Sequence, residues 1–454
     1  MNRVKKVVLM LGASLMSVSA FGQLTSSYFM PGSTIRGELN PALRPLRGYV
    51  SLPTVGGTSA TFLSNSLTVD NLFYPHEGEL VSFLHPSVDA EQFLSTLNKG
   101  DNTLNAGVDS KILGVGVYIG RGFLTFDMDV KADVQAVLPY ELFDFLKNSK
   151  SGQAYSLGGT MANATATAEM ALGYSRELFK GFTLGVRGKY IAGLGYAKMH
   201  FDELNFALNE DVWGISSHGV ADVAMHNLHI PTNADGAWNL EGIKMGEPEE
   251  LAGSGMALDL GVTYDLGFAR LSASVLNLGF MNWSAEYAQR GVASGTYAFT
   301  GAEIESDGSS SPLEEAELAD FVKFKPTAAE SFSSKLTSNV VLGAEVPLIN
   351  DILSVGLVYN LTTRELYNSS QLTLAATLNP TRWLSASATY SSFGATLSGT
   401  ETFGMAFNIH TSRVNLFVGT DYMVREVTPQ LIPVHQNNIN FYFGASVPLA
   451  GSKY

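Results

Sequence analysis

The chain of 454 residues contains no cysteine, so disulfide bonds cannot stabilise its fold. Positive charge is scarce, because 28 Lys and Arg stand against 42 Asp and Glu, for a formal charge of −14. Phosphate contacts require a basic surface, so we expect no nucleic-acid partner. Beyond the first residues, no apolar run approaches the roughly 20 residues that a membrane-spanning helix needs. Stability must therefore come from packing and backbone pairing.

Residues 1–22 are typical of a secretory signal peptide. Three cations precede the short apolar run Val7–Met16, and small residues follow it. We predict cleavage between Ala20 and Gln23, and the missing cysteine excludes a lipoprotein anchor. Cleavage would lower the formal charge to −17, because 25 Lys and Arg would remain against 42 Asp and Glu.

What the chain does contain is regular alternation of apolar and polar residues. In "NINFYFGASV" (Asn438–Val447) every second residue from Ile439 to Val447 is apolar, and the residues between them are polar or small. Successive side chains of a strand point to opposite faces, so this is a strand with one apolar face. Similar segments of about ten residues recur, joined by turns, at 111–120, 123–134, 256–266, 270–280, 353–362, 403–410 and 414–422, and 371–390 holds two of them around an Asn-Pro turn. The tight link at Arg121–Gly122 indicates a hairpin.

These segments predict an all-β chain: a transmembrane antiparallel up-and-down β-barrel of about 14 strands with a few short helices. We expect an N-terminal hatch segment at 23–47 and the barrel at 48–454, with long loops near 200–250 and 281–334. Helical patterns occupy 85–100, 139–149 and 311–323, the first with Ser87 as a candidate N-cap.

A soluble β-sandwich also alternates, but three features favour a bilayer. The strands are as long as a tilted strand must be to cross it. Charges occur in mid-strand, which suits a wet lumen and is costly towards lipid. Aromatic residues collect near strand ends, as in an interfacial girdle: Tyr118, Tyr174, Tyr190, Tyr264, Tyr359, Trp383, Tyr390 and Tyr422.

Several phrases carry a resemblance to known proteins. They are "SSYF" (Ser26–Phe29), "NPA" (Asn40–Ala42), "LPYELFDFLK" and "ALDLGVTYDL" followed by "LSASVLNLGFMNW". Together they resemble an uncharacterised family of Bacteroidota outer-membrane β-barrels, a domain of unknown function. The chain is more distantly similar to FadL-type hydrophobic-compound transporters and to PorV-like barrels. The FadL resemblance implies an N-terminal hatch folded inside the barrel, but no ligand-contacting residue is matched.

The hatch segment is rich in arginine, although the protein is acidic. We predict that a hatch is held inside the lumen by arginine–carboxylate pairs, which are strong and geometrically specific. The hatch residues are Arg36, Asn40, Pro41, Arg44 and Arg47, and the lumen charges are Asp127, Asp129, Asp133, Glu169, Arg187 and Lys189. The alternative is a disordered periplasmic tail with solvated arginines.

The sequence offers little for catalysis. His410 and Ser412 lie near a turn without a candidate oxyanion site. His218, His226 and His229 with Asp222 make a thin metal motif, and the acidic runs 247–250 and 303–307 are typical of solvated loops. A phosphate-binding loop and a dinucleotide fingerprint are both missing from the sequence. We therefore predict no enzyme, no cofactor and no metal.

The favoured function is a passive outer-membrane channel or transporter for small hydrophobic compounds. The alternative is a surface anchoring or partner-binding barrel without transport, and a soluble exported β protein is a third reading. The expected partners are outer-membrane lipid and either a hydrophobic small molecule or a surface protein. The expected location is the outer membrane of a Gram-negative cell.

Overall fold

The computed structural model describes residues 24–452 apart from 54, 77–78, 210–211, 300–321, 350–351, 398–399, 425 and 427–435. The expected signal peptide, almost all of the expected helix at 311–323 and the C-terminal Tyr454 lie outside the described residues.

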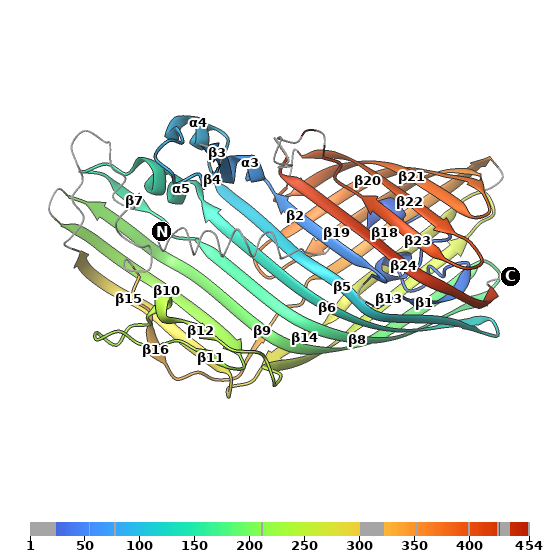
Figure 1. Ribbon diagram of the computed structural model, residues 1–454, viewed down its shortest axis with the longest axis horizontal. Coiled ribbons are helices and arrows are strands. Elements are labelled where there is room, and N and C mark those ends of the chain that lie inside the picture. Colours follow the sequence, from blue (N-terminus) through green and yellow to red (C-terminus); the bar gives the residue numbers. More distant parts are fainter. Residues whose placement is uncertain are drawn as a thin grey trace.

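The chain forms a closed antiparallel barrel of 14 strands, which confirms the predicted fold class (Figure 1). The first wall position is shared by two strands, β1 (Arg47–Ser51) and β2 (Thr58–Ser64). The others are β5 (Asp101–Ile119), β6 (Gly122–Pro139), β8 (Met161–Phe179), β9 (Phe182–Leu208), β13 (Gly253–Asp265), β14 (Arg270–Trp283), β18 (Ser338–Ile349), β19 (Leu353–Thr363), β20 (Asn368–Thr381), β21 (Leu384–Ala395), β22 (Glu401–His410), β23 (Asn415–Thr420) and β24 (Asn438–Ser452).

The first wall position closes the barrel and is also its most irregular part. Both β1 and β2 pair with β24 on one side and β5 on the other. Ser51 lies opposite Ser446 and Thr58 lies opposite Phe443, so eight residues on one side face four on the neighbouring strand. The extra residues form an excursion at 52–57, where Leu52 and Val55 are exposed. This excursion separates β1 from β2, and we call it the wall interruption.

The two ends of the barrel differ. Tight turns join β5 to β6, β8 to β9 and β13 to β14 at one end, and each has a glycine with positive φ: Gly120, Gly181 and Gly267. A left-handed backbone conformation favours glycine, which explains the short links. The expected hairpin at Arg121–Gly122 is confirmed, since Ile119 lies opposite Gly122. We call this the short-turn end, and short turns face the periplasm in bacterial outer-membrane barrels.

We call the opposite end of the barrel the long-loop end. There the strands continue beyond the barrel as a sheet that we call the extension (Figure 1). The segments where the sequence suggested loops contain the end of β9 together with β10 (Trp213–Met225), β15 (Ala288–Phe299), β16 (Lys325–Thr327) and β17 (Phe332–Ser334). β10 pairs with both β9 and β15. The polar composition of these two segments predicted loops. The strands are stable because their buried faces pack against each other, as Ile215 of the first segment and Ala293 of the second do. Shorter strands are β3 (Phe73–His76), β4 (Glu79–Ser82), β7 (Ala154–Ser156), β11 (Leu228–His229) and β12 (Lys244–Met245).

Short helices cover this extension. They are α3 (Val69–Leu72), α4 (Ala90–Ser95), α5 (Tyr140–Asn148) and the 3₁₀ turn η2 (Leu240–Gly242), and inside the barrel lie η1 (Thr25–Ser27) and α2 (Arg36–Leu39). The helices expected at 85–100 and 139–149 are therefore present, but the first is shorter. Its N-cap is Asp89, whose carboxylate accepts the Gln92 amide, and not Ser87. No helix in the described ranges is long and apolar enough to cross a membrane.

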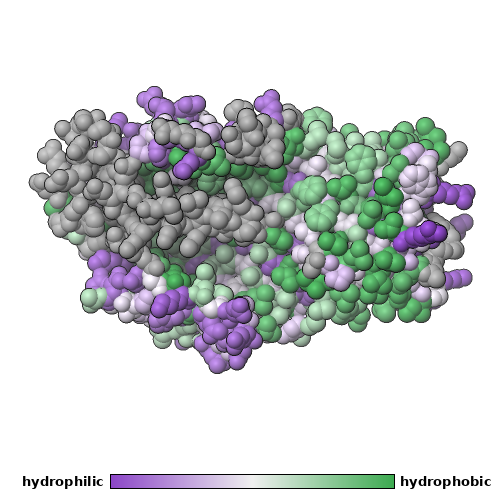
Figure 2. Space-filling view, viewed as in Figure 1, coloured by the Kyte–Doolittle hydropathy of each residue, from purple (hydrophilic) through white to green (hydrophobic). Residues whose placement is uncertain are grey.

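The barrel carries its apolar side chains on the outside. Phe441, Phe443 and Val447 of β24 are exposed, whereas Tyr442 and Ser446 between them are buried. Leu372 and Leu374 of β20 behave in the same way. On the face that Figure 2 shows, hydrophobic side chains cover the barrel, and hydrophilic ones lie on the extension and at the short-turn rim; we call the exposed apolar surface the belt. Such a belt is costly in water and matches the lipid-facing surface of a membrane barrel.

Most of the expected aromatic girdle points outwards, but Tyr118 and Tyr422 do not, and the Tyr118 hydroxyl donates to the carbonyl of Pro45 in the N-terminal segment. Tyr174, Tyr264 and Trp383 are exposed at strand ends. Tyr422 is fully buried, so its assignment to the girdle is wrong. It packs at a tilt against Phe393 inside the barrel, where its backbone amide donates to the buried Asn440 side chain.

Candidate functional site

The N-terminal segment enters the barrel and fills its interior. Asp421 fixes its beginning, because this fully buried carboxylate accepts the backbone amides of Thr25 (3.2 Å) and Ser26 (2.7 Å). Hydroxyl contacts add Ser26 to Thr389 (2.8 Å) and Ser27 to Tyr442 (2.9 Å). Charge-assisted bonds to a buried carboxylate are the strong kind. We refer to residues 24–47, the described part of the expected hatch segment, as the hatch, and its last residue Arg47 begins β1.

The aromatic residues of the hatch lie against wall glycines. Tyr28 is fully buried, its hydroxyl bonds Ser272 (2.9 Å), and its ring lies over Gly343. Phe29 lies over Gly356, where a Cβ would meet the ring at 2.2 Å. The glycines that alternate with apolar residues along these strands therefore make room for the hatch.

The Asn40–Pro41–Ala42 turn is similarly set into the wall. The Asn40 side chain donates to the carbonyls of Val262 (3.2 Å) and Ala273 (3.1 Å), and its own oxygen accepts the Ala42 amide (2.9 Å). A Cβ on Gly261 would lie 2.1 Å from the Asn40 oxygen, and one on Gly185 would lie 2.3 Å from Pro41. Asn40 and Pro41 thus form a turn that packs against the glycines of β9 and β13 and fixes the hatch to these strands.

A group of charged side chains lies at the level of the hatch, and we call it the lumen charge cluster. Its first centre is Lys111, which is buried and ion-pairs with Asp127 (2.8 Å), Glu38 (3.1 Å) and Asp129 (3.2 Å). Glu38 belongs to the hatch, and the other residues belong to β5 and β6. Lys111 therefore joins the hatch to the wall.

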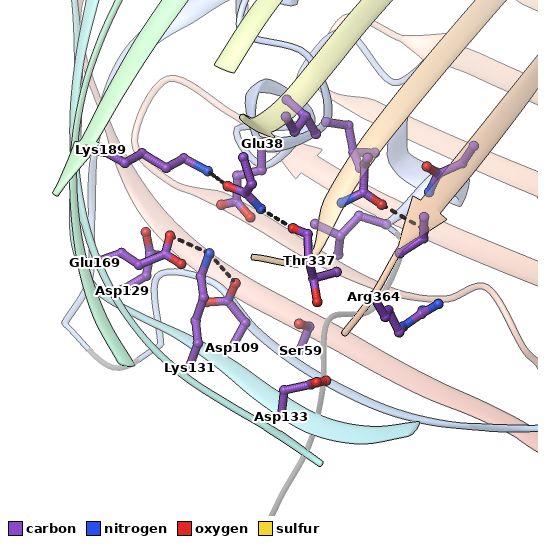
Figure 3. Close-up of a pocket in the computed structure, with 18 of the residues that line it drawn as sticks. Glu38, Ser59, Asp109, Asp129, Lys131, Asp133, Glu169, Lys189, Thr337 and Arg364 are labelled. Carbon is purple, nitrogen blue, oxygen red and sulfur yellow. Dashed lines mark hydrogen bonds and ion pairs between the residues drawn. The ribbon is translucent and has the colours of Figure 1, made fainter. Parts of the chain in front are cut away.

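Three further cations complete the lumen charge cluster. Arg187 (2.7 Å) and Lys189 (2.9 Å) share Asp259, whose carboxylate also accepts the Asn277 amide. Lys131 lies between Glu169 (2.7 Å) and Asp109 (3.5 Å), as Figure 3 shows. Buried charges need such partners, because an isolated charge in a low-dielectric interior is very costly.

The predicted pairing of the hatch arginines with wall carboxylates is wrong. Among the described residues, Arg36, Arg44 and Arg47 form no ion pair with Asp127, Asp129 or Asp133, and the hatch supplies a carboxylate to a wall lysine. Arg44 donates to the backbone carbonyl of Arg121 (3.0 Å), Arg36 is buried and Arg47 is exposed at the start of β1. All three arginines line the cavity at the short-turn end, whereas Asp127, Asp129 and Asp133 are not among its lining residues.

The remaining lumen residues leave little free space. Asp133 accepts from Asn105 (2.6 Å) and Gln135 (2.5 Å) and is satisfied by amides. Cavities of about 80 and 60 Å³ lie above the hatch, lined by the lumen charge cluster and neighbouring polar side chains. Each of these two cavities has room for only a few water molecules, so the described lumen is narrow at the level of the lumen charge cluster.

Histidines of the candidate catalytic and metal motifs form hydrogen bonds within the protein. Ser385 contacts the His410 Nε2 (3.2 Å), and the His226 Nδ1 accepts the Glu249 amide (3.2 Å). Within the described ranges, no group of three or more His, Cys, Asp or Glu side chains is arranged to hold a metal. In the extension, the hydrogen bond from Lys323 lowers the pKa of Asp235, and donation to Glu250 raises the pKa of Tyr287 to about 12.

The closed wall, the apolar belt and the inserted hatch define a β-barrel protein of the outer-membrane type. The chain belongs to a family of unknown function, DUF5723, which matches residues 41–421.

Solved structures of low sequence identity align along almost the whole chain. The toluene transporter TodX of Pseudomonas putida shares 10% identity over 95% of this chain and 97% of its own, with a TM-score of 0.41. A TodX mutant described as a monoaromatic hydrocarbon channel shares 9% over 92% and 95%, with a TM-score of 0.44. A Pseudomonas aeruginosa FadL homologue shares 10% over 93% and 96%, with a TM-score of 0.40. No curated protein sequence matches the chain.

Sequence reasoning missed the residues that hold the hatch most directly. Glu38 is the one acid in a basic segment, which was a usable signal. Lys111 gave none, because strict alternation puts it on the same face as the apolar Leu113 and Val115, and only the irregularity between Lys111 and Leu113 turns it into the lumen. Asp421 had no such signal, because the contact between Ser26 and Asp421 depends on how the barrel closes.

Proposed function

We propose that this barrel is a passive outer-membrane transporter for small hydrophobic compounds, gated by its hatch. The main observation that supports this proposal is the wall interruption at 52–57. It lies beside the hatch, because a Cβ on Gly57 would contact Ile35 (3.8 Å) and Lys111 (3.7 Å). β5 also changes register between Lys111 and Leu113. Two neighbouring strands are thus irregular at one level, with the hatch behind them.

The chemistry of the lumen favours a lateral exit. An apolar compound gains nothing from a passage lined by buried ion pairs, because it would have to displace charged groups that need their partners. The outer surface at the interruption is apolar, with Leu52 and Val55 exposed. In this mechanism the compound enters from the long-loop end, the hatch shifts, and the compound leaves through the wall interruption into the bilayer.

A reversible lock on the hatch tests this proposal. The hydroxyl oxygens of Ser26 and Thr389 are 2.8 Å apart, a separation compatible with a disulfide between cysteines at these positions. Because the chain has no cysteine, the double variant Ser26→Cys/Thr389→Cys has no competing thiol. Uptake of a hydrophobic fluorescent dye by cells should fall on oxidation and recover on reduction.

The two single-cysteine variants are matched controls, and oxidation should leave their uptake unchanged. Formation of the disulfide is checked by mass spectrometry. If the oxidised double variant takes up dye as fast as its reduced form, hatch displacement is not part of the function.

One observation favours a partner-binding function as a second candidate. The β11–β12 pair of the extension carries exposed apolar side chains at Ile243 and Met245, and Met245 is 72% exposed. An exposed apolar strand pair suits a protein partner. Under this function Met245→Lys would weaken surface association and leave dye uptake unchanged, whereas under transport alone it would change neither.

A further inference from the structure

The hatch and the short-turn rim enclose a cavity that differs in charge from the rest of this acidic protein. Its volume is about 1440 Å³, it opens at the short-turn end, and we call it the vestibule. The cations that line it are Arg36, Arg44, Arg47, Lys180, Arg270 and Arg382. The carboxylates that line it are Glu177, Asp265 and Glu345. The vestibule therefore has three more cations than carboxylates, although the whole chain has a formal charge of −14.

Two of the three carboxylates are already ion-paired, and the third, Glu177, accepts the Gly181 amide (2.9 Å). Glu345 accepts the Ser354 hydroxyl (2.7 Å) and ion-pairs with Arg270 (3.5 Å), and Asp265 also pairs with Arg270 (3.6 Å). One arginine thus serves two of the vestibule acids. The excess positive charge lies on the hatch arginines and on the rim.

Arg36 is the residue that most clearly lacks a partner. Only 9% of it is exposed, it lines the vestibule, and its Nε has no hydrogen-bond partner among the described residues. Glu345 attracts it electrostatically but forms no ion pair with it in the described part of the chain. A buried guanidinium nitrogen without a hydrogen-bond partner is costly, so its retention here points to a group that arrives from outside.

We propose that the vestibule is a binding site for a phosphate-bearing anion, held by Arg36 and by the neighbouring hatch arginines. A guanidinium presents a planar fork of donors that matches phosphate oxygens, and the three excess cations suit a multiply charged group. The vestibule is large enough for an organic phosphate or a phospholipid headgroup. This site is separate from the wall interruption, and the proposal does not depend on transport.

Calorimetric titration of the full chain in an uncharged detergent tests the proposal, with phenyl phosphate as the probe and benzyl alcohol as the uncharged comparison. Phenyl phosphate should bind and benzyl alcohol should not. Arg36→Met should weaken phenyl phosphate binding about tenfold or more, since hydrogen bonds to a charged group are lost. Arg413→Met removes an exposed rim arginine outside the vestibule lining and should leave binding unchanged.

A stability measurement separates binding from a structural role. Arg36→Met removes a buried cation without a partner, so its thermal midpoint should equal or exceed that of the wild type. Should Arg36→Met fail to fold, Arg47→Ala alters an exposed residue and should still weaken binding by a measurable factor. Equal binding of phenyl phosphate by wild type and both variants would overturn the proposal, as would equal binding of benzyl alcohol.

The source of the phosphate is distinguished in lipid nanodiscs. If the natural occupant is a lipid headgroup, discs of phosphatidylglycerol should suppress phenyl phosphate binding, and discs of phosphatidylcholine should suppress it less. If the occupant is a soluble phosphate ester, binding should be the same in both discs. Absence of binding in detergent and in both discs would contradict the anion site.

Discussion

Replacing Lys111 with methionine should release the hatch and destabilise the barrel together. Lys111 neutralises three carboxylates at distances of 2.8, 3.1 and 3.2 Å. In the variant, the ion-pair partner that Asp127 keeps within the described ranges is the more distant Arg187 (4.0 Å), which is already bonded to Asp259. Breaking a buried ion pair by removing one partner costs about 3–5 kcal/mol, a large fraction of the roughly 5–15 kcal/mol that stabilises a typical domain.

Two comparisons make the prediction specific. Glu38→Gln removes the hatch carboxylate but leaves Lys111 with Asp127 and Asp129, so its cost should be clearly smaller. Lys323→Met breaks an exposed ion pair with Asp235 and should have little effect. The assays are urea unfolding in detergent micelles, heat-modifiable gel mobility and protease digestion of the hatch. Wild-type stability and wild-type protease resistance in Lys111→Met would refute the reasoning.

Three further changes have definite expected outcomes. Phe441→Arg in the belt should cost about 2–4 kcal/mol in lipid if it lies near the midplane, whereas Met245→Arg in the extension should be tolerated, as measured by urea unfolding in liposomes. Asp421→Asn should weaken the hatch attachment by about 1.5–3 kcal/mol, because amides lose a charged acceptor, and limited proteolysis near Ser26 would report it. Gly261→Val should expel the Asn40 turn and raise dye uptake, whereas Gly188→Val, which meets nothing within 4 Å, should not.

The barrel was predictable because its signal is local. Alternation in a segment such as Asn438–Val447 requires only that neighbouring side chains point to opposite faces. The structure extends this strand to Ser452 and exposes its apolar face. The strand count was accessible for the same reason.

The extension and the hatch contacts were less accessible because they are not local. The pairing of Trp213 with Leu208 and with Phe299 joins segments whose polar sequence suggests loops. The hatch arginines suggested ion pairs with lumen carboxylates, but Lys111 already satisfies Asp127 and Asp129. A segment's charge alone does not reveal which wall charges are already paired.

The central claim is that a charged interior lies within a wall whose apolar face meets lipid, and nitroxide scanning of β24 tests it most directly. Single cysteines, introduced one at a time into this cysteine-free chain, carry the label in liposomes. The account predicts high oxygen accessibility at Phe441, Phe443 and Val447, and low accessibility at Asn440 and Ser446. Access of a water-soluble nickel reagent to Phe441 and Phe443, without this alternation, would contradict it.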